Sequence, residues 1–102
     1  MNIVVHPEAA NELNGAIAFY SSRANRELGL ALINGFAIVN KFKSVVRLLA
    51  TNPHLGSQWL ADAYRFNMRR FPFNIIYRFG GEQLLILAVA HHRRRPGYWK
   101  SR

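Results

Sequence analysis

The strongest constraint on the fold is a change in the spacing of apolar residues halfway along the sequence. After a short apolar run at residues 2–5, apolar residues recur every three or four positions up to about residue 51, which is typical of amphipathic helices. From Tyr64 onward they alternate with polar residues, which is typical of half-buried strands. The chain has 102 residues and no internal repeat or linker-like stretch, so one folding unit is expected. The pattern predicts a single α+β domain over residues 1–102.

The first half is expected to form a strand and a helical hairpin. A short edge strand at 2–5 precedes Pro7, which suits the first turn of a helix over 7–21. A second helix is predicted from 26 to 51, where Asn52 and Pro53 end it. Because the link between the helices is short, they should pack antiparallel. We interpret Gly15 and Gly35 as points where the two helices approach closely.

The second helix is apolar on more than one side, so it needs more than one neighbour. Its main stripe consists of Leu32, Phe36, Val39, Phe42, Val46 and Leu49. Apolar residues outside that stripe are Leu30, Ile33, Ile38, Val45 and Leu48. The first helix and the sheet are two expected neighbours, and a partner protein is the third candidate.

The second half is expected to form three antiparallel strands, over 64–69, 73–79 and 83–90. Gly80-Gly81 is a strong signal for a two-residue hairpin turn. With that turn, Phe79 would face Glu82 and Tyr77 would face Leu84. The face towards the core would then carry Phe73, Ile75, Tyr77, Phe79, Leu84 and Ile86, and the opposite face Asn74, Arg78, Leu85, Leu87, Val89 and His91. The predicted fold is an N-terminal helical hairpin packed on a small, mainly antiparallel sheet.

Charge and composition narrow the classes of function. Fourteen Lys and Arg against five Asp and Glu give a net charge of +9, which favours an anionic partner. The absence of cysteine excludes disulfides and thiolate metal sites, and no spacing of other ligands suggests a metal. There is no glycine-rich phosphate loop leading into a helix, so we expect no cofactor. Neither a signal peptide nor a membrane span is visible, so the expectation is a cytoplasmic protein without a membrane partner.

The tail after the last strand holds the residue types that metal-free RNA cleavage requires. That reaction needs a base, an acid and cations that stabilise the charge on the phosphate. The candidate catalytic residues are His91, His92, Arg94 and Tyr98. The arginines considered for binding nucleic acid or another target are Arg65, Arg69, Arg78, Arg93 and Arg95. Arginines at outward strand positions commonly have no role beyond contact with solvent. Aromatic residues such as Tyr98 and Trp99 more often pack a tail onto the core than stack on a base.

The order of these segments resembles the RelE/ParE superfamily of bacterial toxins from about residue 3 to residue 99. The segments that carry the resemblance are 52–56 (Asn-Pro-His-Leu-Gly), 69–78 (Arg-Arg-Phe-Pro-Phe-Asn-Ile-Ile-Tyr-Arg), 87–91 (Leu-Ala-Val-Ala-His) and the tail. The resemblance implies the toxin of a type II toxin–antitoxin module. Its partner would be a partly disordered antitoxin, and operator DNA would be reached only through that antitoxin.

The superfamily contains two activities, and this sequence has features of both. RelE-like members cut messenger RNA on the ribosome, and Tyr98 with Arg94 or His92 falls near their C-terminal set. ParE-like members poison DNA gyrase. Asn74 stands where RelE-like toxins place an arginine, and the 52–56 helix end looks ParE-like, so the gyrase hypothesis is favoured by a small margin. The other hypotheses are a ribosome-dependent endoribonuclease and a non-toxic nucleic-acid-binding or adaptor domain.

All toxin hypotheses share one expected partner, an acidic, amphipathic antitoxin segment. Charge complementarity with the basic chain would bring it to the sheet face, and apolar contacts to the second helix. The residues expected to contact the antitoxin are Leu30, Ile33, Ile38 and Val45.

Overall fold

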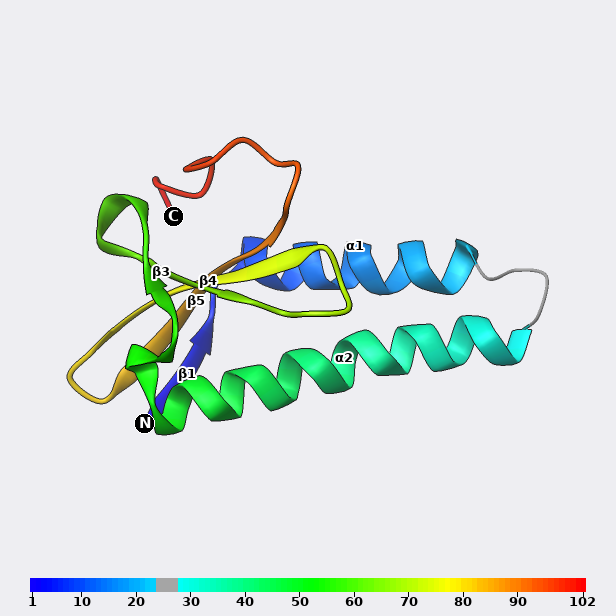
Figure 1. Cartoon of the computed structure of the whole chain (residues 1–102), viewed down its shortest axis with the longest axis horizontal. Helices are drawn as coiled ribbons and strands as arrows, with labels where there is room; N and C mark the ends of the chain where they lie inside the picture. Colours follow the sequence, from blue (N-terminus) through cyan, green and yellow to red (C-terminus); the bar gives the residue numbers. More distant parts are fainter. Residues whose placement is uncertain (24–27) are drawn as a thin grey trace.

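The computed structural model describes residues 1–23 and 28–102, with side chains for 1–21 and 35–102. Its elements are β1 (Asn2–Val5), α1 (Pro7–Arg23), α2 (Leu28–Thr51), β2 (Ser57–Gln58), β3 (Tyr64–Asn67), β4 (Phe73–Gly80) and β5 (Gln83–His91). Two 3-10 turns, η1 (Pro53–Leu55) and η2 (Leu60–Asp62), flank β2. The two helices form a hairpin that extends well beyond the sheet (Figure 1). The predicted α+β fold class is confirmed.

The five strands form one mixed sheet in the order β1-β5-β4-β3-β2. β1 runs parallel to β5, and the other pairs are antiparallel. β5 therefore lies between β1 and β4, as its continuous apolar sequence predicts. β1 is an edge strand, which was also the expectation for residues 2–5.

The hairpin between β4 and β5 turns one residue later than the Gly80-Gly81 signal suggests. Gly80 pairs with Gln83, so Gly81 and Glu82 form the turn. Gly81 has a φ of 57°, a conformation that favours glycine in such a turn. Phe79 consequently faces Leu84, so the predicted pairing with Glu82 was wrong by two residues. A shift of two residues leaves every side chain on its predicted face.

A β-bulge in β5 changes the faces beyond that point. Tyr77 pairs with Ile86 and Ile76 pairs with Ala88, which leaves Leu87 as an extra residue. The alternation of β5 therefore reverses after the bulge. Val89 joins the core beneath the helices, and His91 pairs with Phe73 on that same face. The expectation that Val89 and His91 lie on the opposite face was wrong.

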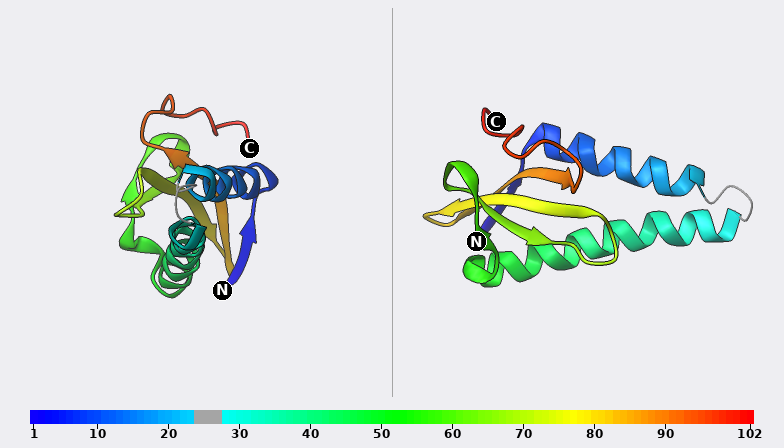
Figure 2. Two further views of the ribbon diagram at one scale, coloured as in Figure 1. Left: turned by 90° about the vertical axis from the view of Figure 1, so that its right-hand side faces the viewer. Right: turned by 45° about the horizontal axis from the view of Figure 1, so that its top comes forward.

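The sheet is covered on both faces. Its inner face packs against both helices around a core that includes Ile38, Val45, Leu49, Ile75, Tyr77, Leu84 and Ile86. Its outer face carries a smaller cluster in which Trp99 of the tail, 1% exposed, packs with Ile76 and Ala88. Figure 2 shows the tail running across the side of the sheet away from α2. The prediction that Trp99 packs the tail onto the core is confirmed.

The faces of α2 differ from those expected. Phe36, predicted in the buried stripe, is 63% exposed, whereas Ile38 and Val45 are 0% and 3% exposed. Ile38 and Val45 contact the core because α2 packs on α1 and the sheet together, so neither is available to an antitoxin in this conformation. Leu30 and Ile33 belong to the part of α2 whose side chains lie outside the described residues.

The predicted close approach of the helices occurs at one of the two glycines. A Cβ on Gly35 would lie 2.8 Å from the Ser21 hydroxyl oxygen of α1, so α1 and α2 are in close contact there. Nothing lies within 4 Å of the corresponding position on Gly15, so that part of the prediction was wrong.

The segment that ends α2 is tied to the sheet by Tyr77. Its hydroxyl donates to the Pro53 carbonyl at 2.7 Å and accepts the Gly56 N–H at 2.9 Å. A Cβ on Gly56 would collide with the Tyr77 ring and lie 2.8 Å from the Arg65 carbonyl oxygen. The glycine of the 52–56 motif is therefore required for this close approach.

Candidate functional site

The tail docks where the edge of β5 loses its strand neighbour. β1 pairs with β5 only as far as Val5 opposite Ile86, because the chain enters α1 at Pro7. Beyond that point the Leu87 carbonyl accepts a hydrogen bond from the Arg102 guanidinium at 2.9 Å. The Val89 N–H donates to the Glu12 carboxylate at 3.0 Å. Side chains from α1 and from the tail thus replace the missing strand.

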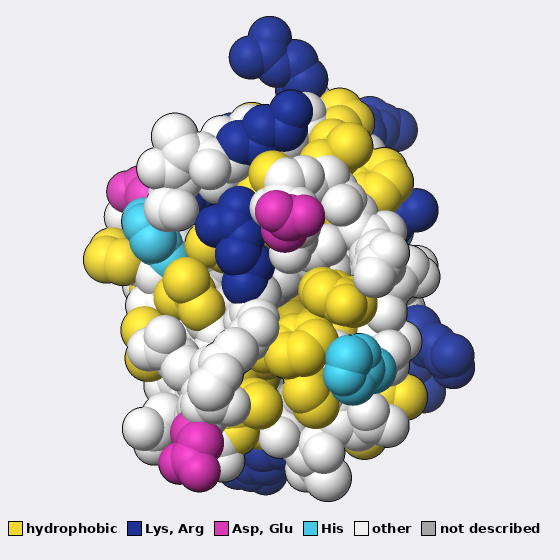
Figure 3. Space-filling view, turned by 90° about the vertical axis from the view of Figure 1, so that its left-hand side faces the viewer, with side chains coloured by type: hydrophobic (Ala, Val, Ile, Leu, Met, Phe, Trp, Pro, Cys, Tyr) yellow, Lys and Arg dark blue, Asp and Glu magenta, His cyan; other side chains and the backbone are white. Residues whose placement is uncertain are grey.

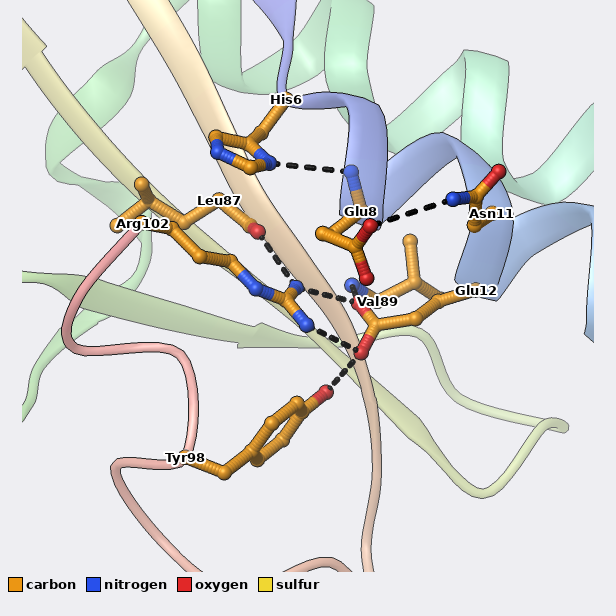
Figure 4. Close-up of polar contacts among 8 residues, drawn as sticks. All are labelled: His6, Glu8, Asn11, Glu12, Leu87, Val89, Tyr98 and Arg102. Atoms are coloured by element: carbon orange, nitrogen blue, oxygen red, sulfur yellow. Dashed lines mark hydrogen bonds and ion pairs between the residues drawn. The ribbon is translucent and has the colours of Figure 1, made fainter.

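Glu12 is the centre of this contact, which we call the Glu12 cluster (Glu12, Val89, Tyr98 and Arg102). The Tyr98 hydroxyl donates to Glu12 Oε2 at 2.5 Å. Arg102 binds both carboxylate oxygens, with Nη1 2.8 Å from Oε1 and Nη2 3.1 Å from Oε2. Together with the Val89 N–H, the carboxylate accepts four hydrogen bonds (Figure 4). The side chains of Arg102 and Glu12 are only 12% and 15% exposed, so the ion pair is mostly shielded from water.

The environment of Tyr98 keeps its proton on the hydroxyl. Burial raises the pKa of Tyr98 well above its usual value, and the hydrogen bond to Glu12 raises it further. The nearby Arg94 and Arg102 lower that pKa, but by less. Tyr98 is therefore a neutral donor to Glu12 near neutral pH, and its catalytic role stays a prediction.

The outer face of the sheet holds a polar hollow of about 440 Å³. Its lining residues come from four segments and are Ser57, Arg65, Asn67, Asn74 and His92. A smaller hollow of about 170 Å³ shares Arg65, Asn74 and His92 with it and extends to the tail. The residues that it adds include Trp59, Arg94 and Arg95. We refer to the two hollows together as the outer cleft.

The geometry of the sheet explains why these side chains converge. Arg65 pairs with Ile76, and Asn67 with Asn74, so the side chains of β3 and β4 alternate onto this face in step. The His92 N–H donates to the Pro72 carbonyl at 2.8 Å, which fixes the chain where it leaves β5. Ile76 and Ala90 line the smaller hollow beneath the polar side chains.

Two arginines of the outer cleft are held by aromatic rings. The guanidinium carbon of Arg65 lies 3.7 Å from the centre of the Trp59 ring. That of Arg94 lies 3.8 Å from the centre of the Tyr98 ring, and Tyr98 is itself bound by Glu12. Such stacking orients a guanidinium and leaves its edge N–H groups available to an anion. In Figure 3, basic side chains lie mainly in the upper half of the face shown, and acidic side chains are visible among them.

The structure separates the other predicted site residues. The His91 ring meets Phe73 edge to face at 5.2 Å on the helix face, and its Nδ1 accepts the Arg93 N–H at 3.0 Å, although His91 also borders the smaller hollow. His91 and His92 thus point to opposite faces, as expected for adjacent strand residues. Arg69 lies in the β3–β4 loop with a φ of 49°, and the Arg78 guanidinium donates to the Ala61 carbonyl at 2.9 Å.

Within residues 1–23 and 28–102, no three His, Asp or Glu side chains gather as metal ligands would. The lining of the outer cleft offers guanidinium groups, carboxamides, the Ser57 hydroxyl, the Tyr98 phenol and the two adjacent histidines. These groups bind an anion and hydrogen-bond to a neighbouring polar group.

Sequence reasoning missed five side chains of these sites, namely Glu12, Ser57, Trp59, Asn67 and Arg102. Glu12 carried a usable signal, because it lies three residues after Ala9 and four before Ala16, both of which are buried. An acidic residue near the apolar face of a helix needs a partner. No signal of this kind marked Trp59, whose role depends on the register of β3.

Comparison with known proteins gives a family and a fold. A family model described as the ParE toxin of type II toxin–antitoxin systems, parDE, matches residues 3–96. A solved structure described as a chromosomal ParDE toxin–antitoxin system from P. aeruginosa is similar, with a TM-score of 0.67 and 22% identity. That match covers 89% of this chain and 95% of the other. No curated protein sequence matches the chain. In the part of the chain that the structure describes, no helix is long and apolar enough to cross a membrane.

Proposed function

Because this chain belongs to the ParE toxin family of type II toxin–antitoxin systems, we propose that it arrests growth by inhibiting DNA gyrase. Membership of the family implies a cognate antitoxin as partner. Gyrase is the target that the resemblance to the ParE branch implies.

The candidate acids and bases are not directed toward one point, and this arrangement favours gyrase inhibition over RNA cleavage. Cleavage needs a base and an acid near the same phosphate. Tyr98 donates its hydroxyl to Glu12, and His91 lies on the helix face of the sheet. Asn74 is neutral where RelE-like toxins carry an arginine. All four candidate catalytic residues line the smaller hollow of the outer cleft. The Tyr98 hydroxyl is nevertheless engaged by Glu12 and the His91 ring packs on Phe73, which favours a toxin that binds its target.

Inhibition of gyrase is tested directly with purified components. The full chain is added in increasing amounts to purified gyrase and relaxed plasmid, and the supercoiled product is measured. The proposal expects supercoiling to fall as toxin is added, and to recover when the cognate antitoxin is present in equal amount. Normal supercoiling in a large excess of folded toxin would contradict it.

The antitoxin is proposed to cover the exposed apolar side of α2. Phe36 and Leu48 are 63% and 47% exposed, and large apolar side chains left open on a helix are typical of a partner surface. An acidic segment would also be attracted to the net charge of +9. We expect Phe36→Asp to reduce co-purification with the antitoxin, whereas Asn11→Asp, which adds the same charge to an exposed position of α1, should not. Equal recovery with Phe36→Asp would count against this surface.

Ribosome-dependent RNA cleavage is the second candidate, and the position of His92 beside Arg65 and Asn74 in the outer cleft favours it. If it is correct, His92→Ala should keep the fold and restore growth. His91→Ala, on the other face of the sheet, is the matched control and should remain toxic. Full toxicity of His92→Ala would argue against cleavage at this site.

A further inference from the structure

We propose that the loop between β2 and β3 binds the guanidinium group of an arginine side chain presented by a partner protein. The site is a hollow of about 230 Å³, which we call the loop hollow, and its lining residues are Gln58, Trp59, Asp62, Ala63 and Tyr64. Of these five residues, only Trp59 also lines the outer cleft. The proposal does not depend on gyrase as the target, because it concerns the chemistry of this hollow alone.

The loop is held in one shape by contacts at its ends and in its middle. The Trp59 N–H donates to the Ala63 carbonyl at 2.8 Å, and both residues pack in the cluster on the outer face of the sheet. The Arg78 guanidinium donates to the Ala61 carbonyl at 2.9 Å. Between these contacts, Ala61 and Asp62 have φ values of 55° and 59°, in the left-handed region. Residues other than glycine stay there only where the surroundings enforce it, so the fold fixes the backbone that carries the Asp62 carboxylate.

Asp62 makes the loop hollow attractive to a cation. Within residues 1–23 and 28–102, its carboxylate forms no hydrogen bond or ion pair. The guanidinium groups of Arg65 and Arg78 are engaged by the Trp59 ring and the Ala61 carbonyl. Asp62 is the charged member of the lining, whose other four residues are neutral. The local charge is therefore negative although the chain has a net charge of +9.

The aromatic residues of the loop hollow favour a guanidinium over an ammonium group. The Trp59 ring already binds one guanidinium, because the guanidinium carbon of Arg65 lies 3.7 Å from its centre. Arg65 lines the outer cleft and not the loop hollow, so it occupies the cleft side of that ring. Tyr64 adds a second ring to the hollow. A guanidinium stacks on aromatic rings and pairs with a carboxylate through two hydrogen bonds, whereas an ammonium is a compact point charge.

The size and surroundings of the loop hollow favour a side chain of a protein over a larger free molecule. Its volume of about 230 Å³ is below the range of roughly 300–1,000 Å³ typical of small-ligand sites. Leu60 of the same loop is 37% exposed, so a protein that presents the arginine would also cover an apolar side chain.

NMR titration of the full, ¹⁵N-labelled chain tests the site, in about 150 mM salt, where repulsion between distant cations is screened. The probe is a short peptide with blocked ends and one arginine between glycines. The matched peptide carries citrulline, which has nearly the same shape without the charge. The Trp59 indole N–H signal is identified by its loss in Trp59→Phe. We expect the arginine peptide to shift this signal and the amide signals of residues 61–63 until saturation, and the citrulline peptide to shift them far less.

Asp62→Asn is the decisive variant, because asparagine keeps the shape of the side chain and tolerates the left-handed backbone. We expect it to weaken binding of the arginine peptide about fivefold. Glu82→Gln removes the same charge from the exposed β4–β5 turn and should leave binding unchanged. If Asp62→Asn does not fold, Asp62→Gly removes the carboxylate with a residue that readily adopts this backbone conformation, and it should weaken binding at least as much.

Four results would overturn the proposal. They are absent shifts, equal shifts with the citrulline peptide, binding that Asp62→Asn leaves intact, and equal loss with Glu82→Gln. Tighter binding of a lysine peptide or of free spermidine would contradict the assignment to an arginine side chain. None of these readouts involves gyrase, so failure of the gyrase proposal would be seen separately.

Discussion

Replacing Glu12 with alanine should destabilise the protein more than any other single change on the surface of α1. The substitution removes the acceptor of four hydrogen bonds, so the Val89 N–H loses its acceptor and the Arg102 guanidinium loses its carboxylate while it keeps the hydrogen bond to the Leu87 carbonyl. Removing one member of a buried ion pair costs about 3–5 kcal/mol. Because Arg102 and Glu12 are 12% and 15% exposed, water compensates part of the loss, and we expect about 3 kcal/mol.

Urea denaturation followed by circular dichroism measures this effect. The midpoint should fall while the slope of the transition stays the same, because the same core is exposed on unfolding. Glu8→Ala is the matched control, since Glu8 lies one turn earlier on α1, where its carboxylate accepts a hydrogen bond from Asn11 at 3.4 Å and makes a smaller electrostatic contribution at Arg102 than Glu12 does. It should cost about 0.5 kcal/mol, through the loss of a favourable charge at the helix N-terminus.

A double-mutant cycle tests whether the effect passes through the tail. Tyr98→Phe alone should cost about 1.5 kcal/mol, because it removes one hydrogen bond to a charged acceptor. In the Glu12→Ala background the same change should cost almost nothing, since the acceptor is already gone. The reasoning would be refuted if Glu12→Ala cost no more than Glu8→Ala, or if the two costs simply added.

Two further predictions concern Gly56, which follows the end of α2, and the ionisation of Tyr98. Gly56→Ala should lower the free energy of unfolding by more than about 2 kcal/mol, because the new Cβ meets the Tyr77 ring and the Arg65 carbonyl. Gly80→Ala is the control, since nothing lies within 4 Å of its Cβ position, and it should lower the free energy of unfolding far less in the same urea assay. Burial and Glu12 raise the pKa of Tyr98 above 10.0, its usual value and the value expected in the unfolded chain, so the folded state holds this proton more tightly. Stability should therefore be fully present below about pH 10 and fall as the pH rises further, and Tyr98→Phe should make that fall shallower. A Tyr98→Phe profile parallel to that of the unmodified protein would disprove the assignment.

The two periodicities of the sequence were sufficient to predict the helical hairpin, the antiparallel strands and the edge position of β1. They were insufficient to predict which side chains of β5 point to which face of the sheet beyond Ile86. Residues 84–90 are all apolar, so their pattern does not reveal which residue is extra, and the bulge at Leu87 was not visible. His91 was consequently predicted on the wrong face.

Residues of the outer cleft could be predicted from the sequence only where the type and strand position of a single residue were sufficient. Arg65 was expected as an outward basic residue of the sheet, and it does line the outer cleft. Its stacking on Trp59 depends on how the chain between β2 and β3 turns back, which involves residues in left-handed conformation such as Ala61 and Asp62. The Glu12 cluster joins residues more than 70 positions apart in the sequence, so local patterns give no information about it.

Pulse labelling of DNA and protein synthesis in one culture, after tightly controlled induction of the chain, tests the central claim most directly. A toxin of the ParE family that acts on gyrase should make DNA synthesis fall first, and co-expression of the antitoxin should prevent the fall. An initial fall in protein synthesis would contradict the gyrase account and identify the ribosome as the target. Unchanged synthesis of both, with folded protein present, would contradict a growth-arresting activity of this chain.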